Sequence, residues 1–189
     1  VFKQLCQKVK KEHILRQGIV YGYFACRSEG DDLVIYPDSK QTEKQVRIPF
    51  PRQKESPYLC VSDFFAQQAD KRMDVVCLAA VTAGSELSKR EAELKQKGAY
   101  RDYFHLHGFG VTFTEALLEY WHREVRKELH IDTKDGTRAE DLFEQKYQGA
   151  RFSFGYPACP DLANQAKLFQ LLHPEDIGIT LTETFMMVP

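Results

Sequence analysis

The feature of the sequence that most restricts its fold is the segment 99–129, in which apolar side chains recur every four residues. This spacing predicts one long helix with a single buried face, and Gly108 or Gly110 marks the expected position of any break. Glu119 and Arg123 are four residues apart, and we expect them on a more exposed face of the same helix. The buried stripe is expected to contain Phe113, Leu117, Trp121, Val125 and Leu129.

Several other segments have the composition of β-strands. Residues 18–26 are β-branched and aromatic, and a turn at 29–32 separates them from the apolar residues 33–36, so an antiparallel hairpin is predicted. Residues 73–83 form an almost continuous apolar run, which predicts a central strand. Shorter strands are expected at 46–49 and 181–188.

Further helices are predicted around these strands. Residues 1–15 place apolar side chains at helical spacing with lysines between them. Ser88 precedes Glu91 by three residues, a capping-box pattern that predicts a helix running to Lys97 with Gly98 after its end. Two more helices are expected at 138–147 and at 161–172, the second with Asp161 as its N-cap.

Strands and helices do not alternate in regular βαβ units along the chain. This order predicts an α+β fold, with a twisted antiparallel β-sheet and helices packed on it. The chain has 189 residues, enough for a single domain of ordinary size over 1–189.

Composition excludes several classes of function. The formal net charge is -1, which provides no general attraction to nucleic acid or to a membrane surface, and no long apolar span is present. The five cysteines are widely spaced, without the short spacing of zinc ligands, so reduced thiols are expected. A small neutral or zwitterionic ligand, or another protein domain, is the better expectation for a partner.

The segment 151–161, with the sequence RFSFGYPACPD, is the most unusual stretch of the chain. Its prolines stiffen the backbone, and Gly155 allows conformations or close contacts that other residues prevent. Arg151 can bind a carboxylate through two parallel hydrogen bonds, backbone groups near Ser153 can meet a nucleoside, and Tyr156 can cover a flat base. The simpler alternative is a connecting loop with a solvated Arg151.

The string RFSFGYPACPD resembles the RxxxGYPACPD pattern of the activation domain of cobalamin-dependent methionine synthases. Four further stretches agree in order, so the resemblance covers nearly the whole chain. They are QGIVYGYFAC with DDLVIY (17–36), Arg52-Gln53 with YLCVSDFFA (58–66), EALLEYWHREVRK (115–127) and LTETFMMVP (181–189).

The resemblance implies which residues contact S-adenosyl-L-methionine. They are Arg151, Ser153 through its backbone, Gly155, Tyr156, and Glu115 at the start of the EALLEY stretch. For Glu115 the alternative is a capping box with Thr112, three residues earlier. The resemblance also places an aspartate contact upstream and a tyrosine contact downstream of this sequence. The 189 residues are therefore expected to be a partial activation domain that lacks both terminal segments.

The resemblance further implies a repair function within a methyltransferase of methionine biosynthesis. The domain would bind S-adenosyl-L-methionine and support reductive methylation of inactive cob(II)alamin back to methylcobalamin, whereas the fragment alone would be inactive. Cobalamin would be held by a neighbouring domain of the same enzyme, and zinc only by another domain. The expected partners are that cobalamin-binding domain and a flavodoxin or another reductase, in the cytoplasm.

Two other functions stay open at this point. One is a stand-alone reactivation module that serves a separate corrinoid protein. The other is a non-catalytic interaction domain of the same fold.

Other reactive residues receive structural interpretations. Cys159 lies between prolines without a nearby histidine motif, so a nucleophilic role is not expected. His105 and His107 are two residues apart and would point to different faces of a helix, which argues against a metal site. The basic run 8–11 is expected to be a solvated helix face.

Overall fold

The computed structural model describes residues 2–37, 45–136, 138, 140–141 and 144–189. Four antiparallel strands form its main sheet, in the order β3-β2-β1-β4. The strands are β1 (Gly18–Glu29), β2 (Asp32–Tyr36), β3 (Val46–Pro49) and β4 (Asp74–Thr82).

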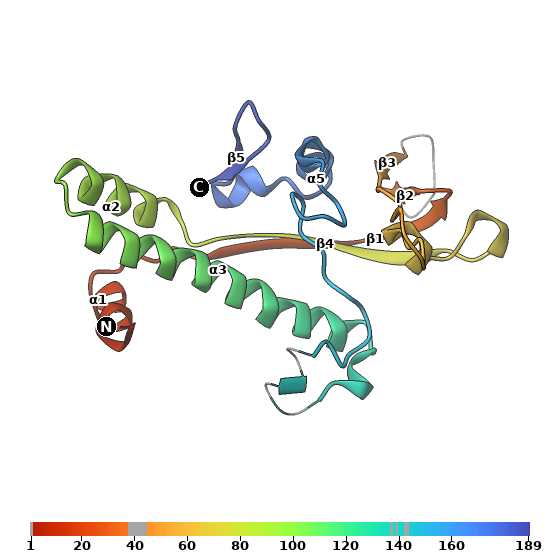
Figure 1. Ribbon diagram of the computed structural model, residues 1–189, viewed down its shortest axis with the longest axis horizontal. Helices are drawn as coiled ribbons and strands as arrows, with labels where there is room; N and C mark the ends of the chain where they lie inside the picture. Colours follow the sequence, from red (N-terminus) through yellow and green to blue (C-terminus); the bar gives the residue numbers. More distant parts are fainter. Residues whose placement is uncertain (1, 38–44, 137, 139, 142–143) are drawn as a thin grey trace.

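The predicted hairpin and the α+β class are confirmed. β1 turns into β2 at Gly30, which adopts a φ of 62°, a value that glycine reaches without strain. The apolar run at 73–83 was wrongly predicted to be a central strand, because among the described strands β4 pairs only with β1 and lies at the edge of the sheet. Both faces of this strand are apolar because helices cover both faces of the sheet (Figure 1).

The two faces of β1 contact different helices (Figure 1). Val20 and Phe24 pack on one face against α5 (Gln165–Leu172). On the other face, the ring of Tyr21 meets that of Trp121 edge-on, with 5.1 Å between centroids. Trp121 belongs to α3, so α3 and α5 cover opposite faces of the sheet. The buried core on the α5 face comprises Cys26, Leu33, Ile35, Val46, Ile48, Leu78, Ala80, Leu168, Phe169, Leu172 and Ile179.

α3 (Tyr100–Glu128) is a single helix of 29 residues that continues through Gly108 and Gly110. At Gly110 a Cβ atom would lie 2.5 Å from Leu87 Cδ2, so the glycine allows close contact with α2 (Ser85–Gln96). Of the predicted stripe, Val125 is fully buried and the other four residues are partly buried. α1 (Phe2–Lys11) packs nearby, and the second core cluster contains Val9, Ile14, Ala83, Leu87 and Leu106.

The start of α2 differs from the prediction. The helix begins at Ser85 after Gly84, three residues before Ser88, so the predicted capping box of Ser88 and Glu91 does not form its start. Gly84 has a φ of 92°, and a Cβ atom there would lie 2.5 Å from the Arg16 carbonyl oxygen. The turn therefore requires glycine because of a contact distant in sequence. The predicted end is confirmed, since Gly98 adopts a φ of 69° after Lys97.

The C-terminal region confirms one prediction and corrects another. Asp161 accepts a hydrogen bond from the Ala163 amide at 2.9 Å and so caps the helical segment that leads into α5. Residues 181–188 are not one strand, because β5 (Thr180–Leu181) and β6 (Met187–Val188) form a small hairpin. The helix predicted at 138–147 falls partly outside the described residues. Short 3-10 helices occur at Val61–Phe64, Gln68–Asp70, Asp132–Lys134, Leu162–Asn164 and Pro174–Ile177.

Among the described residues, every helix is too short or too polar to span a lipid bilayer.

Truncation of the core side chain between α5 and the sheet tests this architecture. Leu172 is 7% exposed, so Leu172→Ala should lower the free energy of unfolding by about 2–5 kcal/mol. Urea denaturation measures the change. Leu59 is 40% exposed, and Leu59→Ala should change the same quantity by less than about 0.5 kcal/mol. Equal effects of the two variants would contradict a core at this face.

Candidate functional site

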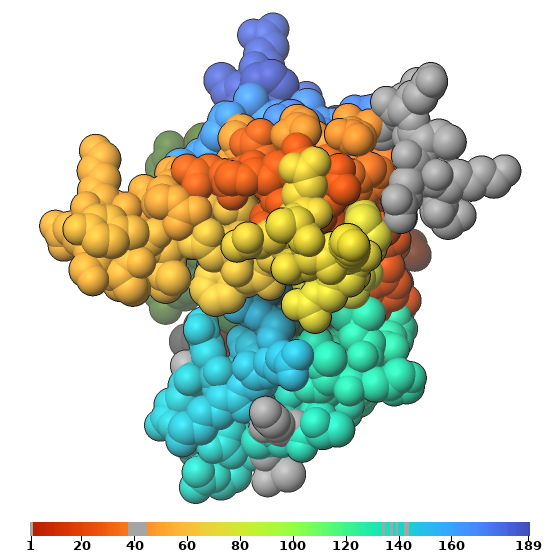
Figure 2. Space-filling view, turned by 90° about the vertical axis from the view of Figure 1, so that its right-hand side faces the viewer, coloured from red at the N-terminus to blue at the C-terminus, as the bar shows by residue number. Residues whose placement is uncertain are grey.

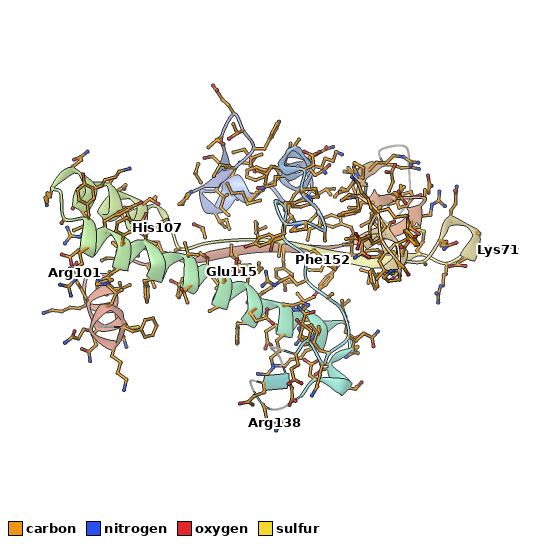
Figure 3. All side chains as sticks on the ribbon, viewed as in Figure 1. Lys71, Arg101, His107, Glu115, Arg138 and Phe152 are labelled. Atoms are coloured by element: carbon orange, nitrogen blue, oxygen red, sulfur yellow. The ribbon has the colours of Figure 1, made fainter. Side chains whose placement is uncertain are left out.

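One arginine and two glutamates meet where the segment after residue 148 passes α3. Arg151 Nη2 lies 3.3 Å from Glu115 Oε2 and 3.4 Å from Glu119 Oε2. Arg151 Nη1 donates to Ser153 Oγ at 3.3 Å. Three of the five predicted site residues, Glu115, Arg151 and Ser153, are thus in contact, and Glu119 joins them (Figure 3 labels Glu115 and Phe152).

Glu119 and Arg123 were expected on a more exposed face of α3. Arg123 is exposed, and the Glu119 side chain, which is 36% exposed, pairs with Arg151 of the loop. The alternative role of Glu115 as a capping partner of Thr112 is excluded. Thr112 lies inside α3, whose N-cap is Ala99, and its hydroxyl donates to the Gly108 carbonyl at 2.8 Å.

The ion pairs are partly open to solvent. The side chain of Arg151 is 24% exposed, and those of Glu115 and Glu119 are 55% and 36% exposed. The cluster has two carboxylates for one guanidinium, so its formal charge is negative. It therefore offers one cationic and two anionic groups to a ligand within a few ångströms.

The turn that follows Arg151 is closed by its own backbone. The Gly155 amide donates to the Cys159 carbonyl at 2.9 Å, and the Cys159 amide donates to the Tyr156 carbonyl at 2.9 Å. Gly155 has a φ of 92°, which side chains rarely tolerate. Among the described residues, the Ser153 amide N–H and the Gly155 carbonyl have no hydrogen-bond partner, so both are available to a ligand.

Cys159 is part of the turn's structure. Its thiol donates to the Ser153 carbonyl at 2.8 Å, and its side chain is buried. Burial raises the pKa of the Cys159 thiol, which keeps it protonated and unreactive at neutral pH. These contacts support the structural interpretation of Cys159.

Two aromatic side chains of this segment are exposed. Tyr156 is 61% exposed and Phe152 is 47% exposed. Figure 2 shows the cyan part of the chain, which follows residue 148, at the surface below the orange and yellow segments. The candidate site is therefore a surface feature that begins at α3 and ends at an exposed phenol ring.

Comparison with known proteins matches this chain to one family along almost its whole length. Residues 2–189 match the family model described as vitamin B12 dependent methionine synthase, activation domain. The chain belongs to this family. The fold expected from the resemblance is confirmed as that of an activation domain.

Two methionine synthases are similar to this chain in sequence. The activation domain is 43% identical over 182 residues to methionine synthase of Mycobacterium tuberculosis (strain ATCC 25618 / H37Rv), a match that covers 90% of this chain. It is 41% identical over 182 residues to the Mycobacterium leprae (strain TN) methionine synthase, again over 90% of this chain. In both cases the chain spans only 15% of the relative's length.

A solved structure has the same fold. It is described as the MetH reactivation domain bound to AdoHcy, and it matches with a TM-score of 0.89 at 28% identity. The match covers 99% of the activation domain described here and 59% of the solved chain.

A buried polar network lies beneath the site of this activation domain and was not predicted. Arg126 is 1% exposed, and Arg126 Nη2 lies 2.7 Å from Asp135 Oδ2. The guanidinium also stacks over the Tyr147 ring, 4.2 Å from its centroid. His122 bridges the network to the loop, with Nδ1 at 2.8 Å from Arg126 Nη1 and Nε2 at 2.8 Å from the Gly149 carbonyl oxygen.

One signal in the sequence could have indicated part of this network. His122 and Arg126 are four residues apart and directly follow Trp121 and Val125 of the predicted stripe. Neighbours of a buried stripe are themselves partly covered, so polar side chains there need partners. The partners Asp135 and Gly149 could not be found this way, because no local pattern connects them to α3.

One hollow lies away from the candidate site. A hollow of about 540 Å³ lies between α1 and α3, lined in part by Phe2, Phe109 and Phe113, and contains none of the predicted site residues. The described residues also contain no group of three or more His, Cys, Asp or Glu side chains that could hold a metal ion.

Removal of the buried carboxylate tests the network. Asp135→Ala leaves the buried Arg126 guanidinium without its anionic partner, so the free energy of unfolding should fall by about 3–5 kcal/mol. Asp135→Asn keeps an acceptor and should lose less. Chemical denaturation measures both. Lys89→Ala breaks the exposed pair with Glu86 and should leave the denaturation midpoint unchanged. A similar midpoint for Asp135→Ala and the native chain would show that the pair is not buried in solution.

Proposed function

We propose that this activation domain binds S-adenosyl-L-methionine at Arg151, Glu115 and the 153–156 turn. Its function is to present the ligand's methyl group to cobalamin held by another domain of a methionine synthase. The observation that carries the proposal is the open charge cluster of Arg151 with Glu115 and Glu119, next to the exposed Tyr156.

Charge complementarity supports this ligand. S-adenosyl-L-methionine has one carboxylate, one ammonium and one sulfonium, so its net charge is positive. Arg151 can bind the carboxylate through its guanidinium, while Glu115 and Glu119 attract the two cationic groups. Because the guanidinium of Arg151 lies within 3.4 Å of a carboxylate oxygen of each glutamate, the cluster matches a ligand that has opposite charges close together.

The turn offers contacts of a different kind for the nucleoside. The Ser153 amide can donate a hydrogen bond and the Gly155 carbonyl can accept one, since both lack partners among the described residues. The exposed Tyr156 ring can cover the adenine base. Serine in place of the smaller residue common at position 153 in the family is compatible with a backbone contact.

The exposure of the site agrees with a domain that acts on a substrate held elsewhere. Methyl transfer leaves S-adenosylhomocysteine on this domain, and a reductase, a flavodoxin in some organisms, supplies one electron to the cobalamin. The side chains described here bind and orient the donor, and none is required as an acid, base or nucleophile. The relative bound to AdoHcy supports this ligand class.

Arg151→Ala tests the carboxylate contact. Loss of the guanidinium should weaken binding of S-adenosyl-L-methionine by about 1.5–3 kcal/mol, measured by isothermal titration. Arg123→Ala removes an exposed arginine from the same region of α3 and should leave affinity unchanged. No binding to the native chain would instead favour a non-catalytic interaction domain, and equal binding by Arg151→Ala would refute the role of Arg151.

Tyr156 provides an independent test of the nucleoside contact. Tyr156→Ala should weaken binding by about 1–3 kcal/mol, because stacking on the base is lost, whereas Tyr156→Phe keeps the ring and should retain affinity. Tyr120 is 58% exposed on α3, so Tyr120→Ala serves as the matched control. The same titration measures all three. Normal affinity in Tyr156→Ala would show that the base binds elsewhere.

A further inference from the structure

His122 connects α3 to the start of the segment 149–156, which carries the proposed ligand contacts. Its Nε2 atom lies 2.8 Å from the Gly149 carbonyl oxygen, and Gly149 is two residues before Arg151. Its Nδ1 atom lies 2.8 Å from Arg126 Nη1. Arg126 in turn donates from Nε to Asp135 Oδ1 at 3.2 Å and from Nη2 to Asp135 Oδ2 at 2.7 Å, so the imidazole is attached to a fixed point.

We infer that His122 is a positioning residue that, in its neutral form, holds the backbone at Gly149 against α3 and thereby sets the place of Arg151. This inference rests on the proposed function, because it assigns His122 a role through the ligand-binding arginine. It does not place His122 in contact with the ligand.

The partners of the imidazole allow only one protonation state. A carbonyl oxygen can only accept a hydrogen bond, so Nε2 must carry the proton that it donates to Gly149. A guanidinium can only donate, so Nδ1 must be unprotonated to accept from Arg126. A second proton on Nδ1 would face the guanidinium and break that contact.

The charged surroundings favour the same state. Glu119 Oε1 is 3.9 Å from Nδ1, beyond hydrogen-bond distance, and it is shared with Arg151. Tyr147 meets the imidazole ring edge-on, and Asp135 is engaged by Arg126. Burial, followed by the positive charge of Arg126 and a smaller effect of Arg151, lowers the pKa of His122 below its ordinary value of 6.5. The hydrogen bond to the Gly149 carbonyl and the charge of Glu119 oppose this shift without reversing it.

The sign of the pH dependence follows from this lowered pKa. Above about pH 6.5 the imidazole is neutral in both the folded and the unfolded chain. As the pH falls below that value, the unfolded chain binds a proton that the folded chain resists, so the contribution of His122 to stability declines. When the folded imidazole is finally protonated, the loop loses its attachment to Arg126.

The backbone conformation at Gly149 explains how the contact with His122 affects the position of Arg151. Gly149 has a φ of 86°, and a Cβ atom there would lie 3.1 Å from Ile131 Cδ1. The chain therefore makes a sharp, closely packed turn at this residue before it reaches Arg151. A carbonyl that is released from His122 would change the direction in which the following residues leave α3.

The test compares three proteins with S-adenosylhomocysteine as the probe. At pH 7.5, His122→Ala should bind about ten-fold more weakly than the native domain in isothermal titration. His122→Gln retains an amide N–H that can reach the Gly149 carbonyl, and it should bind within about three-fold of the native domain. As the pH is lowered from 7.5 through the folded pKa of His122, native affinity should fall relative to that of His122→Gln, which has no titrating imidazole.

A second measurement does not depend on any ligand. Nitrogen-15 NMR should show a neutral His122 protonated at Nε2 in the native domain. Backbone relaxation should show greater mobility at residues 149–153 in His122→Ala than in the native domain, with α5 unchanged.

The outcomes separate the two hypotheses. If the native domain does not bind the probe, the proposed function fails, and the NMR measurements still decide the role of His122. An Nδ1-protonated imidazole, or unchanged mobility at 149–153 in His122→Ala, would overturn the inference. So would affinity in His122→Ala equal to that of the native domain.

Discussion

The structure depends on a sheet whose two faces must both be kept from water. Tyr21 on one face of β1 packs against Trp121 of α3, and Val20 and Phe24 on the other face pack against α5. α3 precedes α5 in the chain, so the polypeptide between them must pass from one face of the sheet to the other (Figure 1). The segment 149–161 makes this crossing, and Phe152 and Tyr156 are exposed along it although Cys159 is buried.

Helix α3 contributes both buried apolar side chains and charged side chains of the candidate site. Val125 is in the core, whereas Glu115 and Glu119 meet Arg151 at the surface. Arg126 lies between these two environments, buried and paired with Asp135. A buried ion pair of this kind adds little net stability compared with apolar side chains, but it fixes the relative positions of its two partners, because a buried charge cannot be left unpaired. Arg126 in turn contacts His122, and His122 contacts the Gly149 carbonyl at the start of the loop.

The sequence was sufficient to predict the elements that depend on local patterns. Periodicity located α3, and alternation of strands with turns located the β1–β2 hairpin. Asp161 was correctly predicted as a cap, because its carboxylate acts on an amide only two residues away. The predicted start of α2 was wrong because Gly84 is selected by a contact with Arg16, which no local pattern reveals.

The site was predictable only in part, because some of its contacts join residues that are distant in the sequence. The residues of the 151–156 turn are contiguous, and the resemblance added Glu115 from α3. The structure brings Glu115 and Arg151 together, but it also adds Glu119, which the sequence had placed only on a more exposed face of the helix. His122 pairs with Gly149 across 27 residues, and such a contact requires the three-dimensional structure.

The pairing of Arg151 with two carboxylates has a consequence for the strength of binding. A ligand carboxylate must displace contacts that the guanidinium already makes, so only the difference between the old and the new pairs contributes to affinity. The charges are also partly hydrated beforehand, which reduces that difference further. Under the proposed function, a donor that binds in this way can dissociate readily once its methyl group has been transferred.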